Sequence, residues 1–190
     1  MADTALKLLV IVASTRENRF GPVVANWFAE QAGQHGDLTV EVLDLGAARL
    51  PADLTDAAPP EVTAVRERIE AADGYVVVTP EYNHTFPASI KILIDWTRGE
   101  WQAKPVGFVC YGGLSGGLRA VEHLRPVFAE MHTVTVRDVV SFHRVWGQFN
   151  DAGRHLDPAG CNAAAKAMLD QLSWWGLTLR DARATRPYGS

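Results

Sequence analysis

The chain has 190 residues, of which 47% are hydrophobic and 21% are charged, and its formal net charge is −4. An acidic chain of this kind is a poor partner for nucleic acids or anionic membranes, so we expect neither. The apolar run at residues 8–13 is too short for a signal peptide or a membrane helix. We expect a single domain over residues 1–190, with a core at about 6–179 and a loose polar tail at 180–190.

The two cysteines indicate the compartment. Cys110 ends an apolar run and Cys161 lies near a helix start, and neither has a CxxC partner or a metal-ligand spacing. We therefore expect buried, reduced thiols, no metal site and a cytoplasmic protein.

The first half of the chain predicts strands and helices in alternation. Residues 6–13 are almost uninterrupted in apolar character, as in a strand that is buried on both faces. A proline opens a helix at residues 22–32. Residues 38–45 alternate between apolar and polar, which is typical of a strand with one wetter face at a sheet edge. An irregular surface connection at residues 46–60 then leads to an amphipathic helix at 61–72.

The second half continues the alternation. Three valines at residues 76–78 predict another strand buried on both faces, and Pro80 ends it. Pro87 can occupy the first turn of a helix that continues over residues 88–96. The rest of the chain predicts, in order, a strand at 105–110, a helix at 120–131, a strand at 133–142, an irregular connection at 143–157 and a helix at 158–179.

This series predicts the fold class. Five strands with intervening helices and right-handed crossovers form an α/β protein with a flavodoxin-like, doubly wound, five-stranded parallel sheet. We expect the strand order 2-1-3-4-5 and helices on both faces. In that order the loops after strands 1, 3 and 4 lie at one rim of the sheet, where ligands of open α/β sheets bind.

The loop after the first predicted strand, residues 14–21, has the features of an anion site. It lies at the amino end of a helix, where free N–H groups and the helix dipole favour an anion. Ser14, Arg16 and Arg19 add a hydroxyl and two guanidinium groups, which suit a phosphate monoester. The alternative, which this loop alone leaves open, is that both arginines are solvated or pair with Glu17.

Two more polar loops follow predicted strands. Glu81, Tyr82, Asn83 and His84 form a tight connection between two prolines, for which the plain alternative is a solvated turn with an N-cap. The loop at residues 111–119 has four glycines within six positions. Glycines let the backbone approach a flat ligand closely and direct several N–H groups toward it.

The tight connection reads Pro80-Glu81-Tyr82-Asn83-His84-Thr85-Phe86-Pro87, and Lys91 and Asp95-Trp96 follow it. This string closely resembles the signature loop and helix of the NADPH-dependent FMN reductase family, which are flavodoxin-like quinone, azo-dye and flavin reductases. Residues 112–119 are similar to the family's second flavin-contacting loop, Gly-Gly-x-Ser-Gly-Gly-x-Arg. Residues 13–16 are similar to its phosphate loop, Gly-Ser-x-Arg, with Ala13 in place of the glycine. The resemblance covers about residues 6–145.

The resemblance implies an FMN-dependent NAD(P)H oxidoreductase. NADPH or NADH would reduce bound FMN, which would pass electrons to a small acceptor (a flavin, quinone, azo compound or metal oxyanion) by a ping-pong mechanism. No catalytic side chain is then required, although His84 is a candidate proton donor or, alternatively, a hydrogen-bonding spacer. Family members are usually homodimers or homotetramers, and we expect one of these. The implied FMN-binding residues are Ser14, Arg16, Arg19, Phe20, Pro80, Glu81, Tyr82, Asn83, His84, Gly112, Gly113, Ser115, Gly116 and Gly117.

Parts of the sequence also fit other functions. A non-enzymatic FMN-binding or electron-transfer protein would share the three loops but would not oxidise NAD(P)H. A serine hydrolase is suggested by residues 113–117, a G-x-S-x-G match with histidines and aspartates downstream that would make Ser115 the nucleophile. A dinucleotide-binding domain is disfavoured, because residues 14–21 lack the G-x-G-x-x-G pattern.

Overall fold

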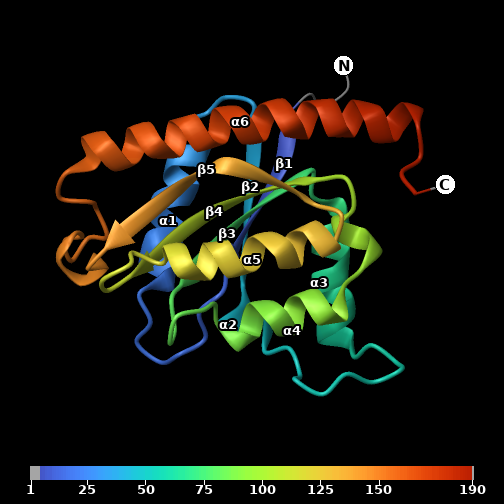
Figure 1. Ribbon diagram of the computed structural model, residues 1–190, viewed down its shortest axis with the longest axis horizontal. Helices are drawn as coiled ribbons and strands as arrows, with labels where there is room; N and C mark the ends of the chain where they lie inside the picture. Colours follow the sequence, from blue (N-terminus) through green and yellow to red (C-terminus); the bar gives the residue numbers. More distant parts are fainter. Residues whose placement is uncertain (1–4, 190) are drawn as a thin grey trace.

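The computed structural model describes residues 5–189, which contain one five-stranded parallel sheet (Figure 1). The strand order is β2-β1-β3-β4-β5, so the predicted flavodoxin-like class and strand order are confirmed. The strands are β1 (Leu6–Val12), β2 (Leu38–Asp44), β3 (Gly74–Pro80), β4 (Pro105–Gly112) and β5 (Val134–His143).

Helices cover both faces of the sheet. Helices α1 and α6 lie on one face, and α3, α4 and α5 lie on the other (Figure 1). The helices are α1 (Gly21–Gly33), α2 (Leu45–Ala48), α3 (Pro60–Ala71), α4 (Ala88–Trp96), α5 (Leu118–Glu130) and α6 (Pro158–Thr185), with short 3₁₀ helices η1 (Gly99–Trp101) and η2 (Val145–Gly147).

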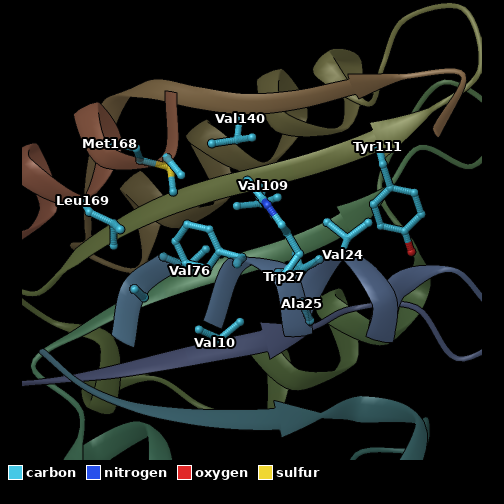
Figure 2. Packing of buried hydrophobic residues seen from close by; sticks show 14 of the residues in the cluster. Val10, Val24, Ala25, Trp27, Val76, Val109, Tyr111, Val140, Met168 and Leu169 are labelled. Atoms are coloured by element: carbon cyan, nitrogen blue, oxygen red, sulfur yellow. The ribbon is translucent and has the colours of Figure 1, made fainter. Parts of the chain in front are cut away.

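Neighbouring residues of the central strands enter two separate hydrophobic cores. Val10 of β1 belongs to the core that contains Trp27 of α1 and Met168 of α6 (Figure 2). Ile11, the next residue, belongs to the opposite core, together with Ile69 of α3. Because both faces are covered, β1, β3 and β4 read as continuous apolar runs. Their carboxyl ends are thereby held rigidly at one rim.

The connection after β2 differs from the expected irregular segment. Residues Leu45–Ala48 form α2, because the Asp44 side chain accepts a hydrogen bond from the Gly46 amide (2.9 Å) at the helix start. Arg49 ends α2 in the left-handed conformation (φ 50°), and its amide donates to the Leu45 carbonyl. The rim therefore has ordered structure on the β2 side as well.

Helix α6 extends past residue 179, where we expected it to end, to Thr185. Arg183 in its last turn donates to the Ala103 carbonyl and lies 3.5 Å from the Asp73 carboxylate. These contacts hold the helix against the body of the molecule after the apolar pattern has ended. The expected loose tail is thus helical over residues 180–185, and residues 1–4 and Ser190 of the expected domain lie outside the described residues.

Both cysteines are free, but they differ in burial. Cys110 is buried as expected, whereas Cys161 is only half-buried, so the expectation of burial is wrong there. No helix among residues 5–189 is long and apolar enough to cross a membrane.

A buried lysine makes the stability depend on pH. Lys104 is only 5% exposed, and its ammonium group donates to the carbonyls of Ile69 (3.2 Å) and Glu70 (2.7 Å). Burial lowers the pKa of Lys104 from 10.5 to about 8. Between these two pH values the unfolded chain binds a proton that the folded chain lacks, so this group adds stability as the pH rises through the window.

We expect the wild type to gain stability relative to Lys104→Met by up to about 1.4 kcal/mol per pH unit across this window. Urea unfolding of both proteins at several pH values between about 7 and 10.5 measures the difference. A difference that does not change with pH would show that Lys104 titrates alike in both states.

Candidate functional site

The candidate site is built from three neighbouring loops at the carboxyl ends of β1, β3 and β4. We call them the first loop (residues 13–20), the middle loop (81–87) and the glycine loop (113–117). The Ala13 carbonyl accepts a hydrogen bond from Ser89 of α4, and the Glu81 amide donates to the Tyr111 carbonyl (3.1 Å). The structure thus brings the three predicted loops together at one rim.

The first loop contains a small polar space at the start of α1. Ser14 is fully buried, and neither its hydroxyl nor that of Tyr111 has a hydrogen-bond partner of good geometry within residues 5–189. A Cβ on Gly21 would overlap the Ser14 Oγ atom and lie 2.9 Å from the Tyr111 hydroxyl. Burial raises the pKa of Tyr111, and its contact with the Ser14 hydroxyl offsets this in part, so the two hydroxyls lie within reach of each other and the phenol is protonated at neutral pH. Two buried hydroxyls that have no partner beyond each other within residues 5–189 indicate that a polar ligand completes this space.

Arg19 is engaged by a neighbouring carboxylate. Its guanidinium group donates to both Asp44 oxygens, at 2.7 and 2.6 Å, and to the Ser14 carbonyl. Burial alone would raise the pKa of Asp44, but the hydrogen bonds from Arg19 and the Gly46 amide outweigh it and lower this pKa. A Cβ on Gly46 would lie 2.6 Å from the Arg19 guanidinium, so a larger residue there would displace Arg19 from its present position. Arg19 therefore joins the first loop to the end of β2.

Arg16 lies apart from Arg19 and reaches the middle loop. Its guanidinium carbon lies 3.9 Å from the centroid of the Tyr82 ring, in a cation–π contact. The two arginines that the sequence suggested for one phosphate are therefore separated. Arg16 is exposed, and part of its hydrogen-bonding capacity is free for a ligand at the rim.

The middle loop is a two-residue hairpin turn. The Tyr82 amide donates to the Thr85 carbonyl (2.9 Å), and the Thr85 amide donates to the Tyr82 carbonyl (3.1 Å). Asn83 (φ 48°) and His84 (φ 76°) occupy the positions that require positive φ in a type I′ turn. Few residues other than glycine adopt this conformation, although asparagine and histidine do so more often than most, and backbone conformations of this kind are concentrated at ligand sites.

Glu81 ties the middle loop to the glycine loop. Its side chain is 9% exposed and accepts hydrogen bonds from the Ser115 hydroxyl, the Arg119 amide (3.2 Å) and the Arg119 guanidinium (3.1 Å). Gly112 lies beside it, because a Cβ there would be 3.6 Å from the Glu81 Cβ. The relative position of the two loops is thus set by one carboxylate, and we call this arrangement the Glu81 latch.

The glycine loop needs glycine for steric reasons. Gly117 has φ 92°, and a Cβ there would lie 2.6 Å from the Tyr111 amide nitrogen. Gly116 has φ 62°, and its carbonyl accepts a hydrogen bond from Ser141 of β5 (2.9 Å). The Gly113 carbonyl accepts one from the Arg144 amide (3.0 Å). The loop is therefore held from both sides with its backbone close to the rim.

Two residues of the implied FMN-binding set, Pro80 and Phe20, have structural positions in the sheet and the hydrophobic core. Pro80 is buried at the end of β3, opposite Tyr111 of β4. Phe20 packs against the core, with its ring centroid 6.5 Å from that of Tyr111 and 5.6 Å from that of Phe149.

Three residues that the implied binding set omits belong to the site. Arg119 could have been found from the Gly-Gly-x-Ser-Gly-Gly-x-Arg pattern, and Tyr111 from its position at a strand end. Asp44 had no local signal, because it meets Arg19 only through the fold.

The arrangement argues against a serine hydrolase. Ser115 donates to a carboxylate, and it is absent from the residues with positive φ in the described chain, although a nucleophile elbow is a strained turn. The nearby histidines bind elsewhere: His123 Nδ1 lies 2.9 Å from Thr85 Oγ1, and His143 Nδ1 lies 3.0 Å from the Leu114 carbonyl. Within residues 5–189, neither of these histidines forms a hydrogen bond with Ser115, as a catalytic triad would require.

The sheet order and the three converging loops define a flavodoxin-like protein with its site at the carboxyl rim. FerB of Paracoccus denitrificans, a flavoenzyme NAD(P)H:(acceptor) oxidoreductase, has this fold with a TM-score of 0.73; it is 23% identical, and the match covers 90% of this chain and 98% of FerB. The model of the NADPH-dependent FMN reductase family matches residues 6–147. The chain belongs to this family, which is a family of oxidoreductases.

Curated relatives agree with this assignment. The 2-hydroxy-1,4-benzoquinone reductase of a Burkholderia species is 28% identical over 186 residues, which are 94% of this chain and 99% of the relative. An NAD(P)H-dependent FMN reductase of Schizosaccharomyces pombe is 37% identical over 120 residues, which are 58% of this chain and 60% of that relative.

Proposed function

We propose that this protein binds FMN at the rim and is an NAD(P)H-dependent reductase of small acceptors such as quinones or flavins. The observation that carries the proposal is the pair of buried hydroxyls of Ser14 and Tyr111 at the start of α1, which have no partner beyond each other within residues 5–189. A phosphate monoester fits this space, because it supplies acceptor oxygens for both hydroxyls and is favoured by the helix dipole. The family and its named relatives support the same ligand.

The residues of the chain would bind and orient the cofactor. Ser14, Tyr111 and the amino end of α1 would hold the phosphate, and Arg16 would add positive charge from the Tyr82 side. The turn at Asn83 and His84 and the backbone of the glycine loop would border the ring, at a spacing set by the Glu81 latch. Bound FMN supplies hydride acceptance from NAD(P)H and electron transfer to a second substrate.

We also propose a ping-pong mechanism, with His84 at the rim as a proton donor. Its ring centroid lies 6.2 Å from that of His123. In this proposal the second imidazole returns a proton to His84 after each donation. We further propose that the chain forms a single domain, assembles as a homodimer or homotetramer and is located in the cytoplasm. The free thiols of Cys110 and Cys161 support a reducing compartment.

The first experiment is an anaerobic spectroscopic titration of the purified chain with FMN. We expect a bound flavin spectrum that survives gel filtration, bleaches with NADPH and recovers when a quinone is added after the NADP⁺ has been removed. Recovery without nucleotide present is the mark of a ping-pong scheme. Flavin that binds but is not bleached by NADPH or NADH would indicate an electron carrier, and no flavin binding would refute the proposal.

A further inference from the structure

A second ligand-sized space opens at the same rim, on the β2 side of the first loop. It is a cavity of about 460 Å³, within the range of small-molecule sites. Thr15 comes from the first loop, Leu45, Arg49 and Leu50 from α2 and the residues after it, and Ser89 and Ile92 from α4. With Gly46 and Ala88, the lining thus combines four aliphatic side chains with two hydroxyls and one guanidinium group.

Arg49 supplies a positive charge that no carboxylate of the described chain neutralises in an ion pair. Its guanidinium group makes no hydrogen bond or ion pair with another residue of the described chain, and the nearest carboxylate along the sequence, Asp44, is taken by Arg19. Arg49 also occupies a left-handed position after α2 (φ 50°), where glycine is usual. Arg49 is exposed to solvent at the edge of the cavity, so its guanidinium group is available to an anionic ligand that enters the cavity.

The cavity is separate from the space around Ser14. The guanidinium group of Arg19 binds the Ser14 carbonyl on one side and lies against Gly46, which lines the cavity, on the other. The ion pair between Arg19 and Asp44 therefore stands between the two spaces. The cavity lining includes neither Ser14, Gly21 nor Tyr111, so the rim offers two anion positions with different residues.

We propose that this cavity binds the adenosine half of the NADPH donor, with Arg49 contacting the 2′-phosphate. This inference rests on the proposed reductase function. The aliphatic side chains of Leu45, Leu50 and Ile92 suit the faces of an adenine ring, and a guanidinium fork suits a phosphate monoester. NADH lacks that phosphate, so the site would give the enzyme a preference for NADPH.

The test uses the FMN-loaded protein and the Arg49→Gln variant. We expect the ratio of the KM for NADPH to the KM for NADH to rise about tenfold in the variant, because one charge-assisted phosphate contact is lost. Calorimetry with adenosine 2′,5′-bisphosphate should show a similar loss, whereas 5′-AMP should bind both proteins alike. Arg137→Gln, which removes an exposed charge from β5, is the matched control.

Several other results would contradict the proposal. Equal changes in both KM values, or unchanged bisphosphate binding, would overturn the proposal. A loss of FMN affinity in Arg49→Gln would assign the cavity to the flavin phosphate, and a change in oligomer mass would assign it to a subunit contact. If the wild type fails to hold FMN, the reductase function fails, but bisphosphate binding to the FMN-free chain still tests the cavity.

Discussion

Replacing Glu81 by alanine is expected to weaken FMN binding by about 10- to 100-fold. Three hydrogen bonds from Ser115 and Arg119 end on this one carboxylate, and bonds to a charged group contribute about 1.5–3 kcal/mol each. Without the carboxylate, the middle loop and the glycine loop lose their common anchor. The ring of the cofactor would then meet two loops that are no longer held at a fixed spacing. Fluorescence titration of FMN into the FMN-free variant measures the effect.

A double-mutant cycle separates the latch from a general loss of stability. Glu81→Ala and Ser115→Ala should each weaken FMN binding, but the double variant should lose little more than Glu81→Ala alone, because both remove one interaction. Glu81→Gln keeps the shape and should fall in between. The control is Glu122→Ala on α5, since Glu122 is 71% exposed and its pair with Arg125 spans 3.4 Å. If Glu81→Ala binds FMN as well as Glu122→Ala does, the latch has no role in the site.

The strands that carry the site could be predicted from the sequence, because burial on both sheet faces produces continuous apolar runs. The valines at 76–78 and the apolar run that begins at Leu6 could be assigned to central strands, and the strand order followed from the alternation with helices. The loops at the strand ends then had to converge. Their convergence needed no knowledge of any side-chain contact.

The partners of the polar side chains could not be predicted in the same way. Arg19 had suitable chemistry for a phosphate, yet Asp44 reaches it from the adjacent edge strand and accepts hydrogen bonds from both of its terminal nitrogens. Which anion pairs with a guanidinium depends on distances that only the folded chain defines. The same holds for the end of α6, where the bond from Arg183 to Ala103 extends a helix beyond its apolar pattern.

Substituting alanine for Gly21 is expected to abolish detectable FMN binding, with a loss of at least about 100-fold. The new Cβ would overlap Ser14 Oγ and approach the Tyr111 hydroxyl to 2.9 Å and Val12 Cγ1 to 3.1 Å. It would thus fill the space in which both hydroxyls are free to bind a phosphate. Gly33→Ala is a matched control at the other end of α1, because a Cβ there has nothing within 4 Å. It should bind FMN like the wild type and be slightly more stable, as alanine favours helix.

Adding Ser14→Ala to Gly21→Ala distinguishes loss of the space from loss of the fold. Removing the Ser14 hydroxyl relieves the worst overlap, so thermal unfolding should recover toward the wild-type temperature. FMN binding should not recover, because the hydroxyl that would bind the phosphate is gone as well. A Gly21→Ala protein that folds and binds FMN normally would show that the phosphate lies elsewhere on the rim, and the cavity beside Arg49 would then be the next place to look.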